Sequence, residues 1–172
     1  SLGTMVANLS AHKPGWDDRW EFYSQWAEKG QQYKNELLFL VDEDTRSFNK
    51  IIEGFRMPKT NEMEIKLRRE AIENATKHAT RIPFKVMETA LKSMEVMMTM
   101  AKEGLQNSLS DAGVGILCAR TAVVGAYFNV RINAKDIKDK SFANDILKDA
   151  RDIYQKAISI EEEMISFINS KM

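Results

Sequence analysis

The sequence is poor in the residues that usually bind metals or form covalent intermediates. It has one cysteine, Cys118, and two histidines, His12 and His78. One cysteine excludes an internal disulfide and favours a reducing compartment, so we expect a cytoplasmic protein. Neither histidine belongs to a His-x-x-x-His, Cys-x-x-Cys or Glu-x-x-His pair, so no zinc or di-iron site is predicted. Any chemistry must therefore rest on carboxylates, amides, lysine or tyrosine.

An excess of either charge is also missing. Lys plus Arg total 25, and Asp plus Glu total 25, which argues against a general nucleic-acid or membrane-surface binder. The longest apolar run, Ala112–Ala119, is stopped by Arg120 and is far shorter than the roughly 20 residues that span a bilayer. Residues 1–12 show no signal peptide, and no phosphate-binding glycine motif occurs. The sequence thus predicts no nucleic-acid or membrane partner.

Only three prolines and eight glycines interrupt the chain, which favours long helices. Hydrophobic residues recur every three or four positions, and no strand-like alternation is present. We predict helices over residues 6–11, 16–54, 61–103 and 111–133, and a last one after Asp139. Capping boxes are expected at Asn61 with Glu64 and at Ser108 with Asp111, and Pro83 should kink or break its helix. The fold class is all-α: one domain over residues 1–172, an antiparallel bundle of about five helices around a buried apolar central helix.

The predicted helices differ in length, and this bears on assembly. The helix over 61–103 would be ~60 Å long against ~35 Å for the central one. Longer helices overhang, and they expose apolar positions that favour a partner. We therefore expect at least a homodimer.

Asp44 is the first candidate functional residue, because it interrupts an apolar seam. The seam consists of Leu37, Val41, Asp44, Phe48, Ile51 and Phe55. A carboxylate buried there must be paired, hydrogen-bonded or protonated. The alternative is a structural ion pair, or a gap where the helix faces water. Asp42 lies off the seam.

The central helix supplies the other candidates. One of its faces carries Asp111, Gly115, Cys118, Ala122, Gly125, Asn129 and Asn133. Small residues allow another backbone to approach, and Asn129 and Asn133 can present two amides to one ligand. Alternatively, both asparagines cap the helix end, and Asp111 caps its beginning. A basic group consisting of Lys66, Arg68, Arg69, Lys77, Arg81 and Lys85 either attracts an anionic tail or forms a solvated face.

Several segments resemble the cyclodeaminase domain of formiminotransferase-cyclodeaminase. They are Met5–Leu9, Leu40–Asp44 with Phe48, Met57-Pro58-Lys59, Pro83, Ser110-Asp111 and the block Gly125–Asn133. The resemblance covers about Leu2 to Met164, and the Gly125–Asn133 block is its most specific part. Relatives have a Gly-Gly-Gly-Ser segment shortly before the part that matches Leu2–Leu9, which this chain begins too late to include.

The resemblance implies a folate enzyme of one-carbon metabolism. That family closes 5-formimidoyltetrahydrofolate to 5,10-methenyltetrahydrofolate and releases ammonia, downstream of histidine breakdown. It is helical, uses no metal, forms dimers or larger assemblies, and is often fused to a formiminotransferase domain. Its substrate is a tetrahydrofolate derivative, with or without a polyglutamate tail. Two alternatives remain open: a methenyltetrahydrofolate cyclohydrolase on the same scaffold, and an inactive helical assembly module.

The residues then suggest roles in that chemistry. Asp44 and Asp111 are the candidate catalytic residues, because a carboxylate stabilises the cationic product and an acid protonates the leaving nitrogen. Asp42, Asn129 and Asn133 are the candidate substrate-binding residues. Asp44 is expected level with residues 71–75, ~15 Å along the axis from the end with the asparagines. We expect Asp44, Asn129 and Asn133 to line one pocket. About 27 Å separates Asp111 from Asn129, so Asp111 either caps its helix or enters that pocket from a partner chain.

Overall fold

The computed structural model describes residues 1–171, and within them it contains five α-helices and no strand. The helices are α1 (Leu2–Ala11), α2 (Trp20–Arg56), α3 (Glu62–Glu103), α4 (Leu109–Ala134) and α5 (Lys140–Asn169). Short 3-10 turns, Asp17–Arg19 and Gln106–Ser108, precede α2 and α4. The predicted all-α bundle of five helices is confirmed.

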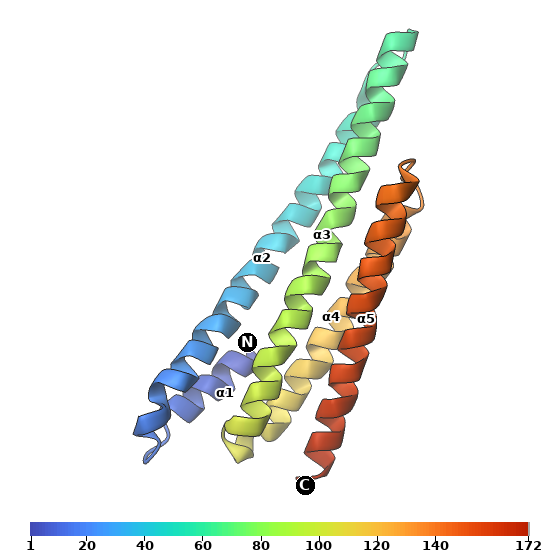
Figure 1. The fold of residues 1–172 in the computed structure, drawn as a ribbon. Coiled ribbons are helices and arrows are strands. Elements are labelled where there is room, and N and C mark those ends of the chain that lie inside the picture. Colours follow the sequence, from blue (N-terminus) through green and yellow to red (C-terminus); the bar gives the residue numbers. More distant parts are fainter. Residues whose placement is uncertain (172) are drawn as a thin grey trace.

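Helix α3 is the central element of the bundle, and not the helix over residues 111–133 that was predicted to be central, which corresponds to α4. It packs against α2 and α4 most extensively, and also against α5 and α1. Successive long helices run antiparallel, and the α2–α3 end projects beyond the turn that joins α4 to α5 (Figure 1). The short α1 lies at the opposite end, against α2, α3 and α4. One end of α3 is therefore enclosed by neighbours, while the other extends past them.

Two of the helix starts agree with the sequence, and one does not. Glu64 donates its backbone N–H to Asn61 Oδ1 at 2.9 Å, and Phe142 does the same to Asp139 Oδ1 at 3.1 Å. The predicted capping box of Ser108 with Asp111 is wrong. The chain enters α4 through a 3-10 turn, and the Ser108 side chain makes no capping hydrogen bond. The Leu109 backbone N–H, which bonds Gln106 O, shows that backbone geometry has replaced the side-chain cap.

Pro83 does not break α3, which is continuous from Glu62 to Glu103. A proline has no N–H, so the carbonyl four residues earlier, that of Ala79, loses its helical donor. The side chain of Asn133 supplies the replacement, because its Nδ2 donates to Ala79 O at 3.3 Å. This bond joins the end of α4 to the middle of α3.

The core is rich in methionine, and α4 is buried on one side only. Met87, Met94 and Met100 of α3 are fully enclosed, with Ile116 of α4. The approach of α3 and α4 is close, because a Cβ at Gly115 would lie 2.7 Å from Met97 Cγ. The other face of α4 is exposed and apolar; it carries Val114, Leu117, Phe128 and Ile132. Within residues 1–171 of a single chain, nothing covers these side chains.

The segment Gln106–Ala134 is long and apolar enough, by length and composition alone, to cross a membrane. Core helices of water-soluble proteins satisfy the same criterion. Here α4, which makes up most of the segment, packs against α3 and α5 along its length. That packing accounts for the apolar residues on the buried side of α4.

Candidate functional site

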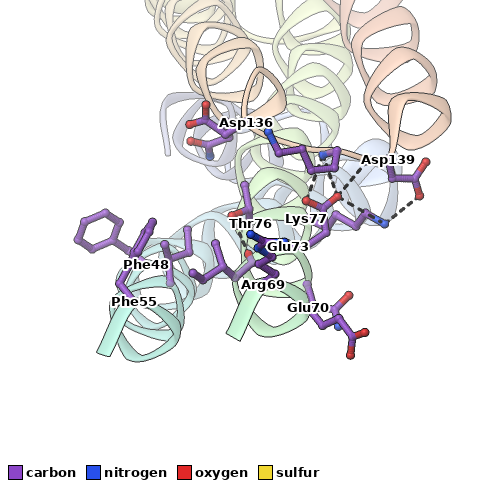
Figure 2. A pocket seen from close by; sticks show the side chains of 14 residues that line it. Phe48, Phe55, Arg69, Glu70, Glu73, Thr76, Lys77, Asp136 and Asp139 are labelled. Atoms are coloured by element: carbon purple, nitrogen blue, oxygen red, sulfur yellow. Dashed lines mark hydrogen bonds and ion pairs between the residues drawn. The ribbon is translucent and has the colours of Figure 1, made fainter. Parts of the chain in front are cut away.

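A pocket of about 870 Å³ lies beside residues 69–77 of α3, where this helix extends past the end of α4 (Figure 2). It has three sides, formed by α2, by α3, and by the end of α4 with the turn into α5. It is lined by Phe48, Ile51, Phe55, Arg69, Glu70, Ile72, Glu73, Asn74, Thr76, Lys77, Asn133, Asp136, Lys138 and Asp139. Apolar groups come mainly from α2, and charged groups come from α3 and the α4–α5 turn. Such a pocket suits a ligand that has both flat rings and polar edges.

The α2 side of the pocket results from the apolar seam. Phe48, Ile51 and Phe55 recur at helical spacing, so they point to the same side of α2. Gly54 allows α2 to approach α3, because a Cβ there would lie 3.0 Å from Ile72 Cγ1. Phe48 and Phe55 are more than half exposed. Aromatic faces in such a position can stack on a planar ligand.

The turn between α4 and α5 is held by charged residues of α3. The Glu73 carboxylate accepts backbone N–H bonds from Lys138 and Asp139 at 3.0 Å, and Lys77 Nζ donates to Asp139 Oδ2 at 2.8 Å. Partial burial raises the pKa of Glu73, but the two backbone bonds and Lys77 outweigh it, so the pKa is lowered. The hydrogen bond from Lys77 lowers the pKa of Asp139. Both carboxylates therefore stay charged and fix the turn (Figure 2).

Of the five residues predicted for the site, Asn133 is the one that lines the pocket. Asn129 lies one turn earlier on α4 and is exposed. Asp44 lies one turn before Phe48 on the same side of α2. It is exposed, which agrees with the alternative interpretation that the seam has a gap where the helix faces water. Asp42 is exposed on α2 away from that side. The catalytic and binding roles of these residues remain predictions.

The expected position of Asp44 along the bundle is wrong. Gly54 packs on Ile72, and Lys85 Nζ lies 3.5 Å from Glu36 Oε1. Counting inward from these two contacts places Asp44 opposite residues 77–82 of α3, not 71–75. The prediction assumed that α3 begins level with the end of α2, whereas its first turns extend past that end. Since Asn133 bonds to Ala79, Asp44 on α2 and Asn133 on α4 lie at nearly the same level along α3.

Asp111 lies outside the pocket. It is half-buried in the first turn of α4, 22 residues before Asn133, which corresponds to about 33 Å along a helix. Within one chain it cannot contact a ligand in this pocket. Entry from a second chain remains the route by which it would take part.

The predicted basic group divides between several places. Arg69 and Lys77 line the pocket, and Lys66 lies with Arg69 in an adjoining depression. Arg81 and Lys85 line a different hollow, between α2, α3 and α5. Arg68 donates to Phe55 O at 3.2 Å and so closes the end of α2. Of the basic group, Lys66, Arg69 and Lys77 therefore lie in or beside the pocket, where they can attract an anionic tail of a ligand.

Sequence reasoning missed Glu73, Asp136, Lys138 and Asp139 as pocket residues. Glu73 and Lys77 have the spacing of a helical ion pair, which is too common a pattern to mark a site. Asp136, Lys138 and Asp139 come directly after the predicted end of the helix over residues 111–133. Their closeness in sequence to Asn133 was the signal that could have identified them as pocket residues. Residues 1–171 contain no group of three His, Cys, Asp or Glu side chains arranged to hold a metal ion.

Comparison with known proteins places this chain in a family. The family described as Formiminotransferase-cyclodeaminase matches residues 1–152. Over its whole length, the chain is 27% identical to the methenyltetrahydrofolate cyclohydrolase of Methylorubrum extorquens and covers 83% of that protein. It is 36% identical over 107 residues, 62% of the chain, to the formimidoyltransferase-cyclodeaminase of Mus musculus, and 31% identical over 142 residues, 83% of the chain, to that of Gallus gallus.

The chain spans only 20% and 26% of the lengths of these two vertebrate relatives. The fold matches the crystal structure of the formiminotetrahydrofolate cyclodeaminase from Thermotoga maritima with a TM-score of 0.84 and 21% sequence identity. That match covers 98% of this chain and 80% of the other. The predicted resemblance is confirmed: the chain belongs to the formiminotransferase-cyclodeaminase family, whose members process one-carbon folates.

Proposed function

We propose that this chain closes 5-formimidoyltetrahydrofolate to 5,10-methenyltetrahydrofolate. Nitrogen 10 attacks the carbon of the protonated formimino group, and a new N10–C bond forms. The bond from that carbon to its terminal nitrogen then breaks, and the proton of nitrogen 10 leaves with ammonia. The positive charge of the protonated substrate remains on the methenyl bridge of the product.

The observation that carries this proposal is the pocket itself, in a chain of this family. Its α2 side offers Phe48 and Phe55 to flat rings, and its other side offers Asn133 to a polar ring edge. Arg69, on α3, carries positive charge in the pocket, which suits the carboxylates of a folate tail, with or without added glutamates. A folate has these three features: flat rings, a polar pterin edge and a tail of carboxylates.

In this mechanism, the residues of the chain bind the folate and move protons. Asp44, one turn beyond Phe48, is the candidate that stabilises the cation or protonates the leaving nitrogen. Asn129 would contact the substrate from the neighbouring turn of α4. Asp42 faces another side of α2, so its proposed contact with the substrate would need a second copy of the chain. The reaction needs no metal in this proposal, and a chelator should leave the rate unchanged.

A cyclohydrolase is the second candidate, and a specific observation favours it. The relative that this chain matches from end to end, over 83% of the relative's length, is named a methenyltetrahydrofolate cyclohydrolase. In that reaction, water adds to the methenyl carbon, one C–N bond breaks, and a formyl group and a proton result. Against it stands the higher identity to the vertebrate cyclodeaminases, 36% and 31%.

One experiment separates these possibilities. The chain, and a longer form extended at its N-terminus by the glycine-rich segment of its relatives, would be given 5-formimidoyltetrahydrofolate while the absorbance of methenyltetrahydrofolate and the release of ammonia are followed. A second series would start from methenyltetrahydrofolate and follow its loss. Appearance of the methenyl product with one ammonia per turnover supports the cyclodeaminase. Enzymatic loss of methenyltetrahydrofolate alone supports the cyclohydrolase. If the longer form catalyses neither reaction, the result supports an inactive helical assembly module.

We also propose that the chain works as a homodimer or larger assembly. The exposed face of α4 carries Val114, Leu117, Phe128 and Ile132, and that of α2 carries Leu38 and Val41. Apolar surface of this extent favours a partner, and a second copy would cover both faces. A second copy could also bring Asp111 to the site. Light scattering that gave a monomer at micromolar concentration, in the longer form, would contradict this.

The names of the vertebrate relatives join a transferase activity to the cyclodeaminase. We propose that a formiminotransferase, fused or separate, supplies the formimidoyl substrate here too. A cytoplasmic location is part of the same proposal. Pull-down of a formiminotransferase from the cytoplasmic fraction of the source cells, with this chain as bait, would test it.

A further inference from the structure

The side of the pocket formed by α4 and the α4–α5 turn has an unusual polar character. Asn133 and Asp136 both line the pocket from this side. In Figure 2, Asp136 lies across the pocket from Phe48 and Phe55, and apart from the group formed by Glu73, Lys77 and Asp139. A ring stacked on the aromatic side would therefore present one edge to Asn133 and Asp136.

The amide of Asn133 has a fixed orientation. Because Pro83 leaves the Ala79 carbonyl without a helical donor, this carbonyl needs an N–H from elsewhere, and Asn133 Nδ2 provides it at 3.3 Å. The reverse orientation would place two oxygens against each other. Asn133 can therefore offer only its Oδ1, an acceptor, to a ligand.

Asp136 is the uncommitted carboxylate on this side. Glu73 and Asp139 are occupied by the backbone bonds of the turn and by Lys77. Glu70 extends away from Phe48 and Phe55 in Figure 2. Within residues 1–171, Asp136 has neither an ion pair nor a side-chain hydrogen bond. A carboxylate offers two oxygens, so Asp136 and Asn133 Oδ1 together present acceptors on this side, to which Lys138 of the same turn adds a cation.

We infer that Asp136, together with Asn133 Oδ1, recognises the 2-amino and N3–H edge of the pterin ring and so determines substrate specificity. This inference rests on the proposed folate function. The 2-amino group and N3–H are adjacent donors on one edge, and a carboxylate accepts both at once, as it does from a guanidinium. The pterin of tetrahydrofolate derivatives carries this edge whatever one-carbon group is attached, so the contact serves either proposed reaction.

The position of Asp136 is well defined before a ligand binds. It lies between Asn133, which is bonded to α3, and Lys138 and Asp139, whose backbone N–H groups are held by Glu73. The turn therefore has little freedom to lose on binding, which favours a specific contact.

The test compares the wild-type chain with Asp136→Asn. Calorimetry would measure binding of 5-formyltetrahydrofolate, which cannot lose ammonia, and of its analogue with oxygen in place of the 2-amino group. We expect Asp136→Asn to weaken 5-formyltetrahydrofolate about 10- to 100-fold, the range for a lost hydrogen bond to a charged group. The wild type should prefer the 2-amino form by a similar factor, and Asp136→Asn should lose that preference.

Two controls make the result specific. Asp152→Asn removes an exposed carboxylate on α5, outside the pocket, and should bind as the wild type does. Para-aminobenzoylglutamate lacks the pterin, so Asp136→Asn should leave its binding unchanged. The inference is overturned if Asp136→Asn binds both ring analogues as the wild type does. A wild-type chain that binds none of the three compounds would instead overturn the proposed folate function.

Discussion

The two halves of α3 have the same backbone conformation but different surroundings. Every fully buried residue of α3 lies between Ala79 and Ala101, where α1, α2, α4 and α5 surround it with a methionine-rich core. From Glu62 to Lys77, fewer neighbours reach the helix, and the pocket occupies the open side. The bond from Asn133 to Ala79 marks the boundary. Packing at one end therefore makes a rigid platform for polar residues at the other.

The largest expected difference between the halves is in stability. Ile116 is fully buried against the enclosed half of α3, so Ile116→Ala should lower the free energy of unfolding by about 2–5 kcal/mol. Phe48 is 59% exposed beside the pocket, so Phe48→Ala should lower it by less than about 1 kcal/mol while weakening folate binding. Urea denaturation and calorimetry of both variants measure this. Equal losses of stability would show that the pocket half also carries the fold.

The next effect is on catalysis. In a form that turns over 5-formimidoyltetrahydrofolate, Asp44→Asn should reduce turnover about 10²-fold or more, the scale of losing a general acid or base. Because Asp44 is exposed, the midpoint of urea denaturation should stay the same. Asp42→Asn is the matched neighbour and should mainly raise KM. Near-normal turnover of Asp44→Asn would show that Asp44 has no catalytic role.

The enclosed half of α3 was far easier to predict than the open half. Helical periodicity identified all five helices, and side-chain caps located the starts of α3 and α5, since both signals are local. The pocket depends on how far α3 extends past α2, and this register follows from the packing of the two helices, in which Gly54 meets Ile72 and Lys85 meets Glu36. No local pattern encodes that register, which is why the level of Asp44 was wrong. Asn133 was predicted as a pocket residue, but its bond to Ala79 requires knowledge of what Pro83 lacks.

The boundary between the halves gives a smaller effect that a double-mutant cycle can isolate. Asn133→Ala leaves the Ala79 carbonyl without a donor and should cost about 1–3 kcal/mol of stability. In a Pro83→Ala background, the backbone N–H of residue 83 replaces the lost donor, so the same change should cost less. Urea denaturation of the four proteins measures the difference. An equal cost in both backgrounds would mean that Asn133 acts through something other than this carbonyl.

The smallest effect concerns the charged contacts that hold the turn in the open half. Glu73→Gln keeps one oxygen for the N–H groups of Lys138 and Asp139 but loses the charge. At neutral pH, we expect a cost of about 0.5–1.5 kcal/mol. The control Glu70→Gln alters an exposed neighbour with no side-chain bond within residues 1–171 and should change little.

The pH dependence follows from the direction of the pKa shift. The folded state lowers the pKa of Glu73, so its stabilising effect is present above the unfolded value of about 4.3 and is lost as pH falls through the folded value. Wild type and Glu73→Gln should therefore converge in stability once the pH falls below the folded-state pKa of Glu73. Both proteins should still lose stability at low pH, because the pKa of Asp139 is lowered too and its protonation also destabilises the folded state. Thermal unfolding between pH 7 and pH 3 measures the gap. A gap that stayed constant with pH would show that the Glu73 charge does not hold the turn.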